Sequence, residues 1–291
     1  MINQRLHFVA VVSVFLAVAV GLVVGVTAIG GGGDGDTAAA HDDTQRLRGE
    51  IDRLEADADQ AQEFATEVAP ATLGGMLDDE RVLLVGVGGA GGEQLDEVAA
   101  ALSYSRAKTA GRLELSKQFT DPDNGDRLVD LAAKVTPRGI KPPNNNDGVE
   151  TASALLAMST LAKRDVAQRD RDEIVTALEH LGMLAAPAEL ESDPADAVII
   201  VTGDTADAAN VVTLADRFGR EGPAVLAGAR SAGVIDTMRG DPSAATRVST
   251  VDNVDTPQGR VSTVLALPGT IAGEIGHYGT GATATTAVPA P

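Results

Sequence analysis

The sequence contains no cysteine and no tryptophan, and aromatic residues make up only 2% of its 291 positions. The absence of cysteine excludes disulfide bonds, thiolate metal ligands and a cysteine nucleophile. With so few aromatic side chains, the core must be built from Ala, Val, Leu and Ile. This composition suits helices packed on a mostly parallel sheet, because the buried strands of such sheets read as aliphatic runs.

Positive charge is also scarce, since 23 Lys and Arg residues face 42 Asp and Glu residues and the net charge is −19. Such a surface repels the phosphates of nucleic acids, so we expect no nucleic-acid partner. The same charge is compatible with attraction of cations, with a salt-rich habitat and with solubility alone. It therefore excludes one class of partner without selecting another.

The longest apolar run, "FVAVVSVFLAVAVGLVVGVTAI", covers residues 8–29 and carries no charge. It meets the requirement of roughly 20 residues for a membrane-spanning helix. Arg5 precedes the run and Asp34 follows it, so the positive-inside rule predicts a cytoplasmic N-terminus and an exported remainder. The run is longer than the apolar core of a signal peptide, about 7–15 residues, and no A-x-A site follows directly. We therefore predict a cytoplasmic lead and an uncleaved membrane anchor over residues 1–29, with a cleaved signal peptide as the alternative.

A glycine-rich and acidic stretch at residues 30–43 predicts a flexible linker, and a heptad pattern follows it at residues 44–69. The apolar residues of this segment alternate between spacings of four and three, which is typical of an a/d seam. The seam residues are Leu47, Ile51, Leu54, Ala58, Ala61, Ala65 and Val68. The pattern predicts a short coiled coil that joins a homo-oligomer or binds a partner protein of the membrane envelope. The alternative is an amphipathic helix that packs on the chain's own domain.

From residue 80 onward, aliphatic runs alternate with helical patterns. The runs "RVLLVGV" (81–87) and "DAVIIVTG" (196–203) are typical of buried strands, whereas residues 93–107 and 207–218 are typical of helices. This alternation predicts an α/β layered domain with a mostly parallel sheet over residues 80–281. The remaining residues, 282–291, are predicted to form a disordered tail.

One segment matches a cofactor motif. In "GVGGAGGE" (86–93), Gly86, Gly88 and Gly91 fit the G-x-G-x-x-G pattern that lets backbone amides approach a pyrophosphate. The acidic residue expected about 20 positions later is matched only loosely, by Glu114. We therefore interpret the loop as a permissive strand-to-helix turn and predict no nucleotide cofactor. Because no G-x-S-x-G frame is present either, we predict no catalytic residues and a protein that is not an enzyme.

Candidate metal ligands are few and scattered. Cu(I) prefers sulfur ligands and Cu(II) accepts imidazole, but the four His and five Met residues show no ligand spacing. The weak candidates are His180 with Met183, which lie three residues apart, and His277, which precedes Tyr278 in "GEIGHYGTGATA" (273–284). The alternative interpretation places His180 at a helix C-terminus, Met183 in the core, and the His277–Tyr278 pair in an irregular glycine-rich chain exit.

The segment "STVDNVDTPQGRVSTVLALPGTIAGEIGHYGTG" (249–281) resembles the closing signature of the actinobacterial copper transporter family, the family of the mycobacterial outer-membrane channel protein MctB. The N-terminal "VFLAVAVGLVVG", the later "IDRL" and the central "VIIVTG" are similar to that family too. The resemblance implies copper efflux or homeostasis through a channel in the cell envelope, with copper as the transported species. It also implies the outer membrane as a location, and it supplies no copper ligands for His277 or Tyr278.

The corynebacterial relatives imply a second function, as membrane-anchored partners of a complex that regulates cell division and peptidoglycan hydrolases. One anchor, a short coiled coil and an α/β domain describe such a non-enzymatic scaffold more directly than a pore. A channel would require residues 8–29 to oligomerise, or a rearrangement that the sequence does not indicate. Copper transport is therefore the leading expectation, and the scaffold is the alternative.

Overall fold

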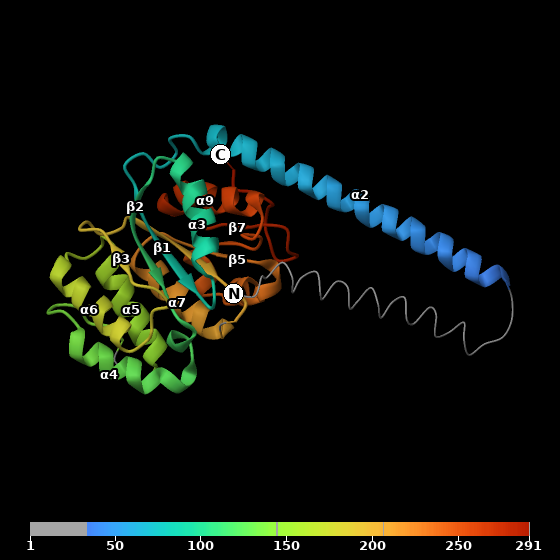
Figure 1. Cartoon of the computed structure of the whole chain (residues 1–291). Coiled ribbons are helices and arrows are strands. Elements are labelled where there is room, and N and C mark those ends of the chain that lie inside the picture. The colour runs from blue at the N-terminus through green and yellow to red at the C-terminus, as the bar shows by residue number, and fades with distance from the viewer. Residues whose placement is uncertain (1–33, 144, 206, 291) are drawn as a thin grey trace. The chain divides into compact units, whose positions relative to one another are not determined.

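The computed structural model describes residues 34–143, 145–205 and 207–290. The chain divides into two units, Met1–Gln60 and Ala61–Pro291, which are described separately. Figure 1 labels the helices and strands named below. The predicted anchor at residues 8–29 lies outside the described residues. Among the described residues, no helix combines the length and the apolar character needed to cross a membrane.

Helix α2 (Asp34–Leu73) is longer than the predicted coiled coil at both ends. It includes positions 34–43, which were expected to form part of a flexible linker, and it continues past Pro70. The alanines at positions 38–40 have the highest intrinsic helix propensity, which explains the earlier start. Pro70 lies in the last turn and cannot donate a hydrogen bond to the carbonyl four residues earlier, so it weakens the helix close to its end.

The second unit is built on a seven-stranded sheet with the order β3-β2-β1-β4-β5-β6-β7. All neighbouring strands pair in parallel except β2 and β3, which are antiparallel. The strands are β1 (Arg81–Val87), β2 (Lys108–Glu114), β3 (Glu189–Leu190), β4 (Ala197–Thr202), β5 (Ala224–Gly228), β6 (Val248–Val251) and β7 (His277–Tyr278). This arrangement confirms the predicted α/β fold with a mostly parallel sheet.

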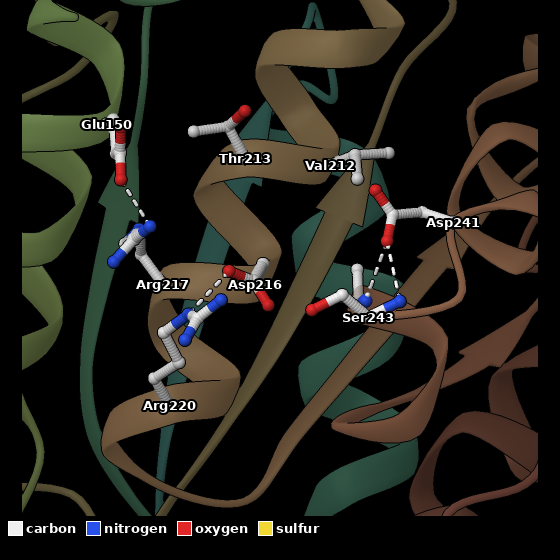
Figure 2. Close-up of a pocket in the computed structure, with 9 residues that line it drawn as sticks. Glu150, Val212, Thr213, Asp216, Arg217, Arg220, Asp241 and Ser243 are labelled. Carbon is white, nitrogen blue, oxygen red and sulfur yellow. Dashed lines mark hydrogen bonds and ion pairs between the residues drawn. The ribbon is translucent and has the colours of Figure 1, made fainter.

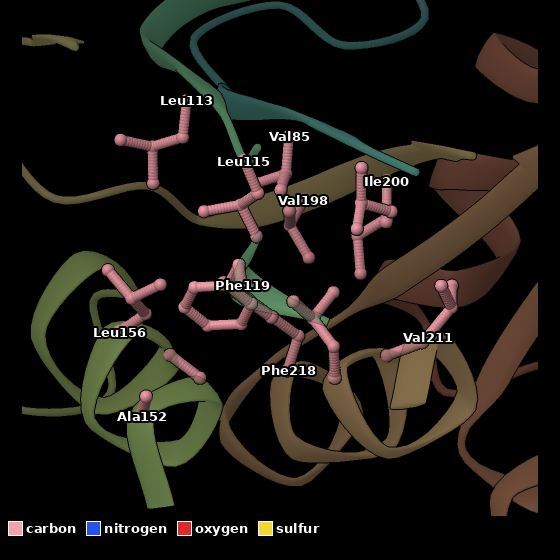
Figure 3. Close-up of a cluster of buried hydrophobic side chains, with 14 of the residues drawn as sticks. Val85, Leu113, Leu115, Phe119, Ala152, Leu156, Val198, Ile200, Val211 and Phe218 are labelled. Atoms are coloured by element: carbon pink, nitrogen blue, oxygen red, sulfur yellow. The ribbon is translucent and has the colours of Figure 1, made fainter. Parts of the chain in front are cut away.

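Helices cover both faces of the sheet. They are α3 (Gly92–Tyr104), α4 (Gly125–Val135), α5 (Gly148–Thr160), α6 (Gln168–His180), α7 (Ala208–Glu221), α8 (Val234–Gly240) and α9 (Pro257–Ile271). On one face, Leu83 and Val85 pack with residues of α4 to α8, including Phe218 (Figure 3). On the other face, Val82 and Leu84 pack with α3, α9 and the last turns of α2. Successive strand residues point to opposite faces, so the strands β1, β4, β5 and β6 each contribute to both cores.

The last β-α-β unit of the sheet has the opposite hand to the others. The connections β4-α7-β5, β5-α8-β6 and β6-α9-β7 all step toward the same edge of the sheet, but α7 and α8 lie on one face and α9 on the other. The β1-α3-β2 unit steps toward the opposite edge with α3 on the face of α9, so it shares the hand of the α7 and α8 units. Such crossovers are right-handed in about 98% of cases, so the closing β6-α9-β7 unit is the unusual one.

Residues 282–290, expected to form a disordered tail, instead return along β7. Thr285 donates its backbone N–H to the carbonyl of His277 at 2.7 Å, and Gly279 donates to the carbonyl of Thr286 at 3.0 Å. Pro289 is buried. The difference arises because backbone groups of the tail hydrogen-bond to those of β7, an interaction that composition does not reveal.

Candidate functional site

The glycine-rich segment that matches the cofactor motif lies where a doubly wound sheet binds its ligand. In such sheets, ligands occupy the crevice at the carboxyl ends of the strands where the strand order reverses. Here the order reverses between β1 and β4. The glycine-rich residues 88–91 follow β1, and residues 203–205 follow β4. The position of the loop is therefore compatible with a dinucleotide site. The contacts of the loop distinguish such a site from a structural turn.

Those contacts join the two loops to each other. The Oγ1 of Thr205 donates to the carbonyl of Gly88 at 2.6 Å, and the backbone N–H of Gly203 donates to the carbonyl of Val87 at 2.9 Å. A Cβ at Gly203 would lie 2.6 Å from the Gly88 carbonyl oxygen, and one at Gly89 would lie 2.6 Å from the Thr205 hydroxyl. The glycines thus allow two loops of the same chain to approach closely.

The acidic residue that matched the motif loosely is also engaged. The carboxylate of Glu114 lies 2.8 Å from Arg112 Nη2, and Arg112 donates a further bond to the Gly92 carbonyl at 2.9 Å. Glu114 is therefore held by a neighbouring guanidinium in the position where a ribose hydroxyl would be recognised. These contacts support the interpretation of residues 86–93 as a turn.

A polar pocket of about 240 Å³ lies between α5, α7 and the segment after α8 (Figure 2). It is lined by Glu150, Val212, Thr213, Asp216, Arg217, Arg220, Asp241, Ser243 and Ala244. Asp216 lies 2.7 Å from Arg220 Nε and 3.0 Å from Arg247 Nη1, and Glu150 is paired with Arg217. Each of these carboxylates is neutralised by arginine, so a metal cation would have to displace a guanidinium to bind here.

Asp241 at the rim of the pocket is engaged differently. Its carboxylate accepts the backbone N–H groups of Ser243 at 2.8 Å and Ala244 at 2.9 Å. The bonds from Ala244 and Ser243 lower the pKa of Asp241, because they favour the charged form. This carboxylate therefore fixes the turn after α8.

The three candidate metal ligands are not brought together. His180 is exposed at the end of α6, whereas Met183 is fully buried in the core on that side of the sheet. His277 lies in β7, with Nδ1 3.0 Å from the Thr250 hydroxyl. Burial and the positive charge of Arg239 lower the pKa of His277, against a hydrogen bond with the backbone of Ala245 that raises it. The described part of the chain contains no group of three His, Cys, Asp or Glu residues placed to hold a metal ion.

A buried ion pair with several further hydrogen bonds joins α8 to the segment that carries the family resemblance. Arg239 of α8 and Asp252, just after β6, form an ion pair of 2.7 Å with side-chain exposures of only 3% and 4%. Asp252 also accepts the backbone N–H groups of Thr280 at 2.8 Å and Gly281 at 3.1 Å. Arg239 donates to the carbonyl of Tyr278 at 2.7 Å. We name Arg239, Asp252 and residues 278–281 the C-terminal latch.

The latch explains the glycines around the His277–Tyr278 pair. Gly279 has φ +131°, and a Cβ there or at Gly281 would collide with the Asp252 carboxylate. Burial alone would raise the pKa of Asp252, but the hydrogen bonds from Arg239, Thr280 and Gly281 outweigh burial and lower it. Sequence reasoning missed the role of Arg239. The available signal was the glycine spacing in residues 276–281, which indicates a close approach of the backbone to another group.

A different kind of surface lies on α2. Leu47, Ile51 and Leu54 are 54%, 52% and 61% exposed, although they are large apolar residues. We call these three residues the exposed seam. In the second unit, two other residues of the predicted coiled-coil interface are covered by the domain, because Ala65 is 8% exposed and Val68 is half-buried. The role of the seven residues in a coiled coil stays a prediction.

The family model described as copper transport outer membrane protein, MctB, matches residues 1–289. The chain belongs to the MctB family. It is 27% identical to copper transporter MctB of Mycobacterium tuberculosis (strain ATCC 25618 / H37Rv), with 97% of both chains covered, and the Mycobacterium bovis protein gives the same values. Copper transporter MctB of Mycobacterium leprae is 24% identical, with 98% of both chains covered. The family resemblance found in residues 249–281 is thus confirmed, and the match to the MctB family extends over residues 1–289.

Proposed function

We propose that this protein acts in copper efflux or homeostasis at the cell envelope. The observation that carries the proposal is the match of residues 1–289 to the MctB family, together with relatives named copper transporters that align from end to end. The shared region includes the apolar N-terminal run, helix α2 and the α/β domain. The proposal therefore rests on the whole architecture and not on the domain fold alone, which many unrelated functions share.

In this proposal copper is cargo, and the α/β domain is a non-enzymatic module beside its path. Helices pack on both faces of the sheet, and the two loops at the crevice between β1 and β4 are hydrogen-bonded to each other. The carboxylates of the pocket are tied to arginines. Channel-type passage would then depend on an assembly of several copies through residues 8–29.

The second candidate is a membrane-anchored scaffold of a cell-division complex. The exposed seam favours it, because large apolar residues on a solvated helix indicate a surface used for association. The relatives named above carry only copper transporter names, so copper handling remains the first proposal.

Intracellular copper in a deletion strain tests the first proposal. We expect the strain to accumulate more copper than its parent when copper is added, and the full-length protein to restore the parental level. Unchanged copper together with a defect in cell separation would overturn copper handling in favour of the scaffold.

A further inference from the structure

The apolar side chains of the exposed seam are not covered by other residues of the same chain within its described part. Every residue from 45 to 61 is exposed. Burial of a Leu or Ile side chain is favourable, so three such residues on one helix stripe represent a substantial apolar surface in contact with water. Ala58 and Ala61 continue the stripe and are exposed as well.

The heptad positions indicate what covers this stripe. Ile51 and Ala58 occupy a positions, and Leu47, Leu54 and Ala61 occupy d positions. A β-branched residue at a with leucine at d favours a two-stranded parallel coiled coil. The alanines at positions 58 and 61 add little buried area but allow close approach of two helices.

The rest of the chain favours the same orientation. The apolar run at residues 8–29, which the sequence predicts as an anchor, ends just before α2 begins at Asp34. Two copies anchored in one membrane would therefore present their helices in the same direction. A second copy of this chain therefore supplies a helix in the parallel orientation, and no other partner protein is required.

Charge does not favour the parallel register at its described g and e positions. The g position Glu50 falls opposite the e position Glu55 of a second copy, which is repulsive. The pairing is therefore weak between free chains and is strengthened by the high effective concentration of chains held in one membrane.

We propose that residues 47–61 of two copies pair as a parallel two-stranded coiled coil. The pairing ends before Ala65, because Ala65 and Ala69 are buried by the domain that follows and are unavailable to a second chain. Residues 47–61 of α2 thus contact a second copy, whereas Ala65 and Ala69 pack on the domain of their own chain. This inference does not depend on the copper function.

Cysteine cross-linking in native membranes tests the pairing, because the chain contains no cysteine of its own. Leu47→Cys and Leu54→Cys place a thiol at successive d positions, and Ala56→Cys places one at the exposed f position on the opposite face. In a parallel register each d residue lies opposite its own copy. After mild oxidation of the full-length protein, we expect several-fold more disulfide-linked dimer from both seam variants than from Ala56→Cys.

Three results would overturn the proposal. Equal cross-linking of all three variants, or no cross-linking of any of them, would show that residues 47–61 of two copies do not pair. Cross-linking at only one seam position would indicate an antiparallel crossing. A product with the mass of this chain plus a different protein would replace the second copy with another partner. None of these results changes the copper level of the deletion strain, so this proposal and the copper function fail separately.

Discussion

The exposed seam and the C-terminal latch differ in how completely the chain itself satisfies them. In the latch, Arg239 and Asp252 are almost fully buried and are surrounded by backbone hydrogen bonds. In the seam, Leu47, Ile51 and Leu54 are each more than half exposed. The segment that most resembles the family therefore holds the C-terminal residues on the domain, whereas the helix whose heptad pattern predicts a coiled coil carries the apolar surface still available for association.

The largest expected effect comes from opening the latch. Asp252→Ala leaves the Arg239 charge buried without its partner, and breaking a buried pair in this way costs about 3–5 kcal/mol. We expect a loss of this size in the free energy of unfolding measured with urea, and faster proteolysis within residues 277–290. Asp255→Ala is the matched control, because Asp255 is exposed and its substitution should change stability by less than about 0.5 kcal/mol. A loss below about 1 kcal/mol for Asp252→Ala would contradict the buried-pair account.

A smaller effect is expected where the loop after β4 meets the glycine-rich residues 88–91. Gly203→Ala pushes a Cβ against the backbone of Gly88 and Ala90, so we expect a loss of about 1–3 kcal/mol in thermal or urea unfolding. Gly240→Ala is the control, since a Cβ there meets no other atom within 4 Å. The wild-type protein should also show no thermal shift with dinucleotides. A clear shift would show that the crevice opens for a ligand.

The pH dependence of stability distinguishes His277 of β7 from Asp252 of the C-terminal latch. The pKa of His277 is lowered in the folded state, so its unfolded form binds protons more readily. Its contribution is fully present above the unfolded pKa of about 6.5 and is lost as the pH falls through the folded value. We expect the wild type to lose more stability between pH 7.5 and pH 5 than His277→Gln, measured by urea unfolding.

The pKa of Asp252 is lowered as well, so its contribution is present above the unfolded value of about 3.9 and is lost only in stronger acid. Asp252 should therefore leave the stability between pH 7.5 and pH 5 unchanged. Identical pH profiles for the wild type and His277→Gln in this range would contradict the environment assigned to His277.

The smallest effect on stability is expected at the seam. Replacement of Ile51 and Leu54 by lysine removes apolar surface that is already in water, so the unfolding free energy of the domain should change by less than about 0.5 kcal/mol. The same variant should lose self-association, because two lysines at a and d positions would face their copies. Circular dichroism melting measures the first quantity. A large drop in stability would show that these residues are packed within the chain.

The layered fold was predictable because its strands are continuous aliphatic runs and its helices lie between them. The early start of α2 and the ordered tail were not, since they depend on local propensity and on hydrogen bonds to β7. The latch joins Arg239 to Asp252 only after α8 and β6 pack, so no spacing rule reveals it. The hand of the β6-α9-β7 unit is likewise a property of packing. The heptad residues are exposed up to Ala61 and covered by the domain from Ala65, and this boundary depends on which turns of α2 pack on the domain.

The most direct test of the account is intracellular copper in the deletion strain carrying either the wild type, the Ile51→Lys/Leu54→Lys variant, or Ala56→Lys as the opposite-face control. Channel-type copper passage would need several copies assembled through residues 8–29, and we propose that pairing of the exposed seam, which follows this run in the chain, is required for that assembly. We therefore predict that the wild type and Ala56→Lys restore low copper, whereas the seam variant leaves copper as high as in the deletion strain at equal protein level. Full restoration by the seam variant would contradict the account.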